Sequence, residues 1–98
     1  MKTYELLAIV KPNIDSEDVD NIISKIDSLI TSMNGKVETA EKMGRRKLSY
    51  DIQNFRDGYF VSILLQLPAE KILEFKRQLK LNESLLRTMF MDAAKVGV

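Results

Sequence analysis

The order in which two hydrophobic periods follow one another restricts the fold of this chain more than any other feature. Apolar residues recur at every second position, or almost without interruption, in residues 2–10, 36–53, 59–67 and 85–91. Each of these four segments is therefore predicted to be a β-strand. In residues 16–33 and 68–80, apolar residues recur instead at steps of three and four, which predicts two helices.

The resulting order is strand, helix, strand, strand, helix, strand. It is typical of the ferredoxin-like split β-α-β (βαββαβ) pattern, an α+β fold. In such a fold, a four-stranded antiparallel sheet carries two helices on one face. The 98 residues suffice for a single domain, which we expect to span residues 1–92, with a short C-terminal tail at residues 93–98. No apolar run reaches the roughly 20 residues of a membrane span.

Capping residues mark the ends of the two predicted helices. Asp15 is a good N-cap for the first helix, because its carboxylate can accept hydrogen bonds from the free backbone N–H groups of the first turn. Asn34-Gly35 supplies a left-handed stop at the other end of that helix. Pro68 suits the first position of the second helix.

The second and third strands are expected to form a hairpin. Gly44 interrupts the alternation of the second strand and predicts a bulge or a bend. Residues 54–58 are predicted to form the turn, because Asp57-Gly58 is the strongest hairpin signal in the chain. The charges around Gly44 favour an edge strand, where they discourage pairing with other chains.

Helices on one face leave the opposite face of the sheet open. The side chains expected on that face are Leu7, Ile9, Phe60, Ser62, Leu64, Gln66, Arg87, Met89 and Met91. An open antiparallel face is usually polar, so this apolar set indicates a surface for a protein or an RNA. A self-dimer, a reversed assignment of the faces, and shielding by long neighbouring side chains remain alternative explanations.

The residue types needed for most catalytic sites are missing. The chain has no cysteine and no histidine, which excludes most pairs of nucleophile and base. The acidic cluster of Asp15, Glu17, Asp18 and Asp20 lacks the spacing of a calcium loop and suits the positive end of a helix dipole. No glycine-rich phosphate loop is present. We therefore predict that the protein is not an enzyme and uses no cofactor and no metal.

Acylphosphatases share this topology and supply the rival enzyme hypothesis. Their chemistry needs a phosphate-cradling loop after the first strand. Residues 11–14 of this chain contain neither glycine nor arginine, which argues against that activity.

Basic residues are concentrated in the later part of the chain. The net charge is +1 overall, −3 over residues 1–34 and +4 over residues 35–98. The run Arg45-Arg46-Lys47 and the single Arg87 are the best candidates for phosphate contacts, although a solvated edge strand explains the run equally well. Aromatic residues are too few on the middle strands for the base stacking of an RNA-recognition motif.

The residues resemble the bacterial ribosomal small-subunit protein six family from Tyr4 to about Met91. The carriers of the resemblance are Tyr4-Glu5, Pro12-Asn13, Gly58-Tyr59-Phe60 and the run LKLNESLLR at residues 79–87. A further carrier is Gly44 with Arg46, Leu48, Tyr50 and Ile52, which is similar to the family's G-x-R-x-L-A-Y-P-I. Each motif is weak alone, and together they are specific because their order and spacing fit.

The resemblance implies a structural protein of the cytoplasmic ribosome. Family members lie in the central domain, or platform, of the small subunit and bind small-subunit ribosomal RNA together with small-subunit protein eighteen. By that likeness and by the basic run, the expected RNA-binding residues are Lys2, Tyr4, Arg87, Arg45 and Lys47. The expected protein-partner residues are Met43, Arg46, Tyr50 and Ile52.

The chain departs from the family pattern at three places. Asp51 replaces the usual proline, and Asp92 stands where a basic residue is common. The chain also stops at Val98, short of the longer tail of many members.

The alternative hypothesis is a regulatory module of the same fold that self-associates or binds a small ligand through its open face.

Overall fold

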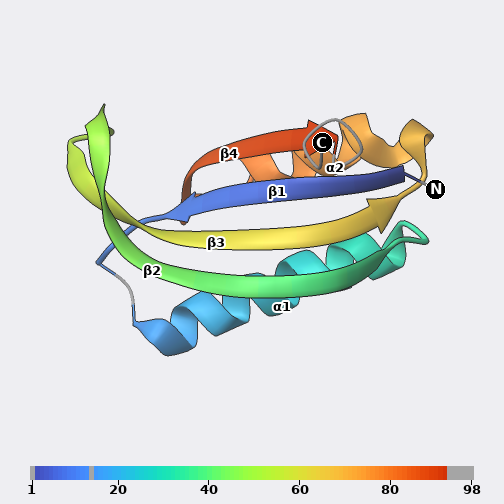
Figure 1. Ribbon diagram of the computed structural model, residues 1–98, viewed down its shortest axis with the longest axis horizontal. Helices are drawn as coiled ribbons and strands as arrows, with labels where there is room; N and C mark the ends of the chain where they lie inside the picture. Colours follow the sequence, from blue (N-terminus) through green and yellow to red (C-terminus); the bar gives the residue numbers. More distant parts are fainter. Residues whose placement is uncertain (1, 14, 93–98) are drawn as a thin grey trace.

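The computed structural model describes residues 2–13 and 15–92 (Figure 1). The predicted tail at residues 93–98 lies outside this part of the chain. The elements, in order, are β1 (Lys2–Val10), α1 (Ser16–Ser32), β2 (Lys36–Ile52), β3 (Phe55–Leu67), a 3-10 turn (Ala69–Lys71), α2 (Ile72–Lys80) and β4 (Leu85–Asp92). The strands pair antiparallel in the order β2-β3-β1-β4. The predicted α+β fold and element order are confirmed.

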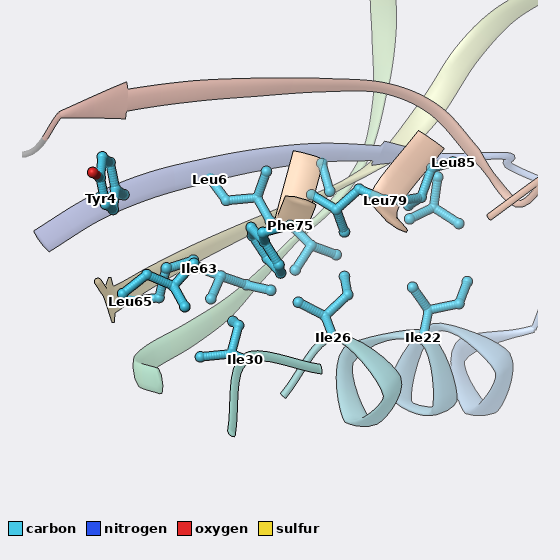
Figure 2. Close-up of a cluster of buried hydrophobic side chains, with 14 of the residues drawn as sticks. Tyr4, Leu6, Ile22, Ile26, Ile30, Ile63, Leu65, Phe75, Leu79 and Leu85 are labelled. Atoms are coloured by element: carbon cyan, nitrogen blue, oxygen red, sulfur yellow. The ribbon is translucent and has the colours of Figure 1, made fainter. Parts of the chain in front are cut away.

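One hydrophobic core joins both helices to the same face of the sheet (Figure 2). Alternate residues of β1 and β3, such as Leu6 and Ile63, are almost fully buried because side chains on a strand alternate between its faces. They pack against Ile26 of α1 and Phe75 of α2. Each fully buried side chain of this size stabilises the fold by about 1.5–3 kcal/mol.

The strand register fixes which residues remain on the open face. Leu7 of β1 lies between Ser62 and Met89, and Ile9 lies between Phe60 and Arg87. Glu5 lies in the same way between Leu64 and Met91. The predicted assignment of the open face is therefore confirmed, and a reversed assignment is excluded.

Both ends of α1 agree with the capping residues. Asp15 is extended and stands at the N-cap, where its backbone N–H donates to the Asp18 carboxylate at 3.4 Å. Asn34 has a positive φ of 65°, and the N–H of Gly35 donates to the Ile30 carbonyl at 2.9 Å. The second helix begins differently, since Pro68 precedes the 3-10 turn and the α-helical part starts at Ile72.

The β2–β3 turn differs from the prediction. It consists of Gln53 and Asn54, whose φ angles of 50° and 67° are those of a two-residue primed hairpin turn. Asp57 and Gly58 lie inside β3, paired with Lys47 and Arg46. The prediction was right for Asn54 and wrong for residues 55–58, because Gly58 serves a close approach to β1 and not a change of chain direction.

Three register shifts bend the long hairpin. They fall between Val37 and Thr39, between Lys42 and Gly44, and between Lys47 and Ile52. The second shift confirms the bulge predicted near Gly44, which has a φ of 90°. Bulges bend and twist a strand, and Figure 1 shows the turn end of β2 and β3 rising steeply from the rest of the sheet. We call residues 44–59 the hairpin arm.

Candidate protein and RNA interface

The hairpin arm curls far enough to contact the opposite edge of the sheet. Tyr50 lies on β2 and Arg87 on β4, and these two strands are separated by β3 and β1. The Arg87 Nη1 atom donates a hydrogen bond to the Tyr50 hydroxyl. The guanidinium carbon also lies 5.9 Å from the centre of the tyrosine ring, within the range of a cation–π contact.

A groove of about 360 Å3 lies between the hairpin arm and the open face. Its floor is apolar and comes from Ile9, Phe60 and Met89 of three strands. Leu48 and Ile52 of the arm form an apolar wall. Ile9 is 5% exposed, so the floor is firmly packed, whereas Met89 at the outer strand is 38% exposed. The groove can therefore take apolar side chains from another molecule.

Most of the predicted partner residues gather at this groove. Arg46, Tyr50 and Ile52 all line it, and all three lie on β2, the first strand of the hairpin. Met43 is different, because it falls at the bulge between Lys42 and Gly44 and lies outside the groove lining. The structure thus joins three of the four residues into one surface and leaves the fourth beside it.

The predicted RNA residues are spread more widely. Arg87 and Lys47 line the groove, while Arg45 makes an ion pair with Asp57 at 2.7 Å. Within the described part of the chain, Arg46 and Lys47 form no ion pair. Their charges therefore stay available to an anionic partner.

Lys2 and Tyr4 lie at the other end of β1. Lys2 is exposed and pairs with Leu67, far along the strand from Ile9. Tyr4 is only 9% exposed and belongs to the core, where its ring meets Phe90 edge-on at 5.6 Å. The structure therefore gives Tyr4 a packing role and leaves its ring without a free face for base stacking.

Sequence reasoning missed two features of this site. It did not predict that Tyr50 and Arg87 touch, because that contact depends on the register shifts of β2. It also missed Leu86, which is 8% exposed outside the main core and lines a second hollow with Gln53 of the turn. The bulge between Ile9 and Val10, opposite Leu85–Arg87, places Leu86 there, and no local pattern signals it.

Metal binding and membrane insertion are two other roles on which the described residues bear. In residues 2–13 and 15–92, no cluster of three or more acidic side chains is arranged to hold a metal ion. No helix in this part of the chain combines the length and apolar character needed to cross a membrane.

Comparison with known proteins gives one consistent answer. A family model described as Ribosomal protein S6 matches residues 3–92. The chain is 34% identical over 89 residues to a small ribosomal subunit protein bS6 from Halalkalibacterium halodurans, covering 91% of this chain and 94% of that protein. It is 39% identical over 87 residues to the bS6 protein of Sulfurimonas denitrificans, covering 89% of this chain and 64% of that protein.

A solved structure shares the same architecture. The crystal structure of 30S ribosomal protein S6 from Thermotoga maritima superposes with a TM-score of 0.89. The match covers 98% of this chain and 91% of that one, at 23% sequence identity. At this identity, the superposition supports the fold.

Proposed function

The chain belongs to the family of ribosomal protein S6, a protein of the small ribosomal subunit, and we propose that it binds small-subunit ribosomal RNA there together with small-subunit protein eighteen. The family consists of structural proteins of the cytoplasmic ribosome and not of enzymes, which confirms the prediction that the chain has no catalytic activity. The proposed location is the central domain, or platform.

The groove beneath the hairpin arm is the observation that carries this proposal. Its apolar floor suits side chains of a protein, because burying them removes apolar surface from water. Its rim carries Arg46, Lys47 and Arg87, and basic side chains of this kind bind phosphates. A surface that combines both properties fits a protein that joins a second protein to RNA.

The protein partner is proposed to bind the arm side of the groove. Ile52 contributes apolar area, and Tyr50 is 60% exposed despite its size. Exposed aromatic residues and arginines are the side chains that most often dominate protein interfaces. Met43 lies on the same edge strand β2, three residues before Arg46, and is proposed to extend this surface.

The RNA is proposed to bind the basic residues around the groove. Arg87 and Lys47 supply positive charge at the rim, and Arg45 adds a charge already paired with Asp57. Lys2 provides a separate contact at the far end of the sheet. Tyr4 then supports that end of β1 from within the core, through its ring contact with Phe90.

The charge of the chain supports the proposal of joint binding. A net charge of +1 gives little non-specific attraction to RNA, because each phosphate neutralised contributes to affinity through counterion release. A partner seated in the groove adds its own contacts to the same RNA. The pair is therefore expected to bind RNA more tightly than either protein alone.

A filter-binding titration tests this proposal. Labelled RNA of the central domain is titrated with the protein, with small-subunit protein eighteen, and with the mixture of the two. The mixture is expected to bind at lower concentration than either protein. Equal midpoints for the isolated protein and the mixture would contradict joint binding.

Self-association through the open face is the second candidate. Met89 and Met91 are 38% and 39% exposed on that face, next to the outer edge of the sheet. Sedimentation of the pure protein separates the candidates. A monomer at micromolar concentration favours the ribosomal pair, and a stable symmetric dimer favours self-association.

A further inference from the structure

The contact between Tyr50 and Arg87 joins a proposed partner residue to a proposed RNA residue. Both residues line the groove. Tyr50 lines one side, from the hairpin arm, and Arg87 lines the facing side, from β4. Their hydrogen bond and cation–π contact bridge the groove from one wall to the other. In the free protein, the Arg87 guanidinium is therefore already engaged by the Tyr50 side chain.

We infer that this contact is a latch that couples partner binding to RNA binding. A partner segment that reaches the apolar floor must pass between the two walls, and it displaces Tyr50 as it enters. The displaced tyrosine releases Arg87, which is then free to contact RNA. The inference rests on the proposed function, since it concerns the same partner and the same RNA.

Tyr50 can move without disturbing the core. Tyr50 lies in the stretch between Lys47 and Ile52, where Leu48–Asp51 oppose a single residue of β3, Arg56. This stretch has lost the regular ladder that holds the rest of the hairpin. Tyr50 is 60% exposed, and the core cluster contains no residue of residues 44–57. Displacement of Tyr50 therefore breaks its contact with Arg87 and disturbs little of the core packing.

The coupling must act in both directions. If a partner frees Arg87 for RNA, then an RNA that takes Arg87 must equally favour the partner, because binding free energies are linked through one cycle. Loss of an exposed cation–π contact corresponds to a change of about fivefold in an equilibrium constant. The latch is thus expected to raise the affinity for RNA by about fivefold when the partner binds.

Removal of the tyrosine ring tests the latch. The variants are Tyr50→Leu, which removes the whole contact, and Tyr50→Phe, which removes only the hydrogen-bond acceptor. The dissociation constant for central-domain RNA is measured for each protein alone and with small-subunit protein eighteen at a saturating concentration. Arg56→Ala is the control, because it removes a charge from the arm outside the groove lining.

The latch predicts a specific pattern. Without the partner, Tyr50→Leu binds RNA about fivefold more tightly than the wild type, and Tyr50→Phe falls between them. With saturating partner, all three proteins bind RNA with the same affinity, because Arg87 is free in each. Unfolding in urea checks that the variants are folded.

Two results would overturn the inference and can be told apart. If Tyr50→Leu binds RNA as the wild type does, or more weakly, while the partner still strengthens binding in both, then there is no latch and the proposed joint binding stands. If the partner fails to strengthen RNA binding by the wild type, then both the latch and the joint binding are wrong.

Discussion

A methyl group on Gly58 would lie 2.5 Å from the Cγ2 atom of Ile9, closer than two carbon atoms can approach. It would also lie 3.3 Å from the Val10 carbonyl oxygen and 3.8 Å from the Leu48 side chain. The absence of a side chain at Gly58 therefore lets the base of the hairpin arm sit against β1. That approach sets the floor and the wall of the groove at a fixed distance from each other.

Replacement of Gly58 by alanine is expected to destabilise the protein. Overpacking of this kind costs about 1–3 kcal/mol in the free energy of unfolding, which urea denaturation measures. Ile9→Leu serves as the paired variant, because leucine lacks the branch at Cβ that carries Cγ2. The cost of Gly58→Ala should shrink in the Ile9→Leu background. An equal cost in both backgrounds would show that the contact with Ile9 is not the cause.

Arg87→Ala is expected to weaken RNA binding by about 1–3 kcal/mol if the guanidinium contacts a phosphate or a base. The loss should appear for the protein pair, where the tyrosine no longer competes for the guanidinium. Arg56→Ala, another exposed arginine, is the matched control and should change the affinity little. Filter binding at one fixed salt concentration measures both. An unchanged affinity in Arg87→Ala would remove this residue from the RNA surface.

The two neighbouring basic residues of the run are expected to differ. Lys47 has no ion pair in the described part of the chain, whereas the charge of Arg45 is already matched by Asp57 at 2.7 Å. Lys47→Ala should therefore lower the RNA affinity and reduce the slope of its salt dependence by about one. Arg45→Ala should have the smaller effect, because the Arg45 guanidinium is already engaged by Asp57 and contributes less to phosphate binding. The slopes come from titrations at four salt concentrations.

A charge placed in the groove wall is expected to block the protein partner. Ile52→Asp buries a carboxylate at the proposed interface, and it should weaken partner binding about tenfold or more. Leu73→Asp is the matched control, because Leu73 is 77% exposed on α2, which packs on the opposite face of the sheet. Calorimetric titration with the partner measures both variants. Equal losses in the two variants would argue against the groove as the binding surface.

Acid should weaken one surface ion pair in a defined range of pH. Hydrogen bonds from Arg77 and Gln78 lower the pKa of Glu74 to about 2 from its ordinary value of 4.5. Because this pKa is depressed in the folded state, the stability that Glu74 contributes is present above pH 4.5 and is lost as the pH falls toward 2. Urea denaturation should show Glu74→Gln to be less stable than the wild type at pH 7. The difference should disappear near pH 2, and one that persists there would exclude the carboxylate as its source.

The sheet and its open face could be predicted because both follow from local periods. Once Leu6 and its alternate neighbours face the core, Leu7 and Ile9 must face away, and no tertiary information is needed. The capping residues of α1 are local in the same sense. They fix the ends of a helix through contacts with residues only a few positions away.

The curl of the hairpin arm could not be predicted in the same way. Asn54 is a common residue in a turn with two positive φ angles but Gln53 is not, whereas Asp57-Gly58 is the stronger turn signal. The position of the true turn follows from the pairing of Arg46 with Gly58 and from the close approach of Gly58 to Ile9. Both are non-local. The groove could not be predicted for the same reason. Its residues were candidates from the sequence, and their meeting depends on three register shifts.

The position of β1 at the centre of the sheet has a consequence for how the protein is made. Among the described strands β1 is synthesised first, yet it pairs with β3 and β4, which are both synthesised after β2. Lys2 cannot pair with Leu67, and Leu6 cannot pair with Phe90, until those partners have been synthesised. Contacts so distant in sequence slow folding, because a long loop has to close before they form. The nascent chain can complete α1 before β1 has any neighbour, and β1 gains its second neighbour only when β4 has been synthesised.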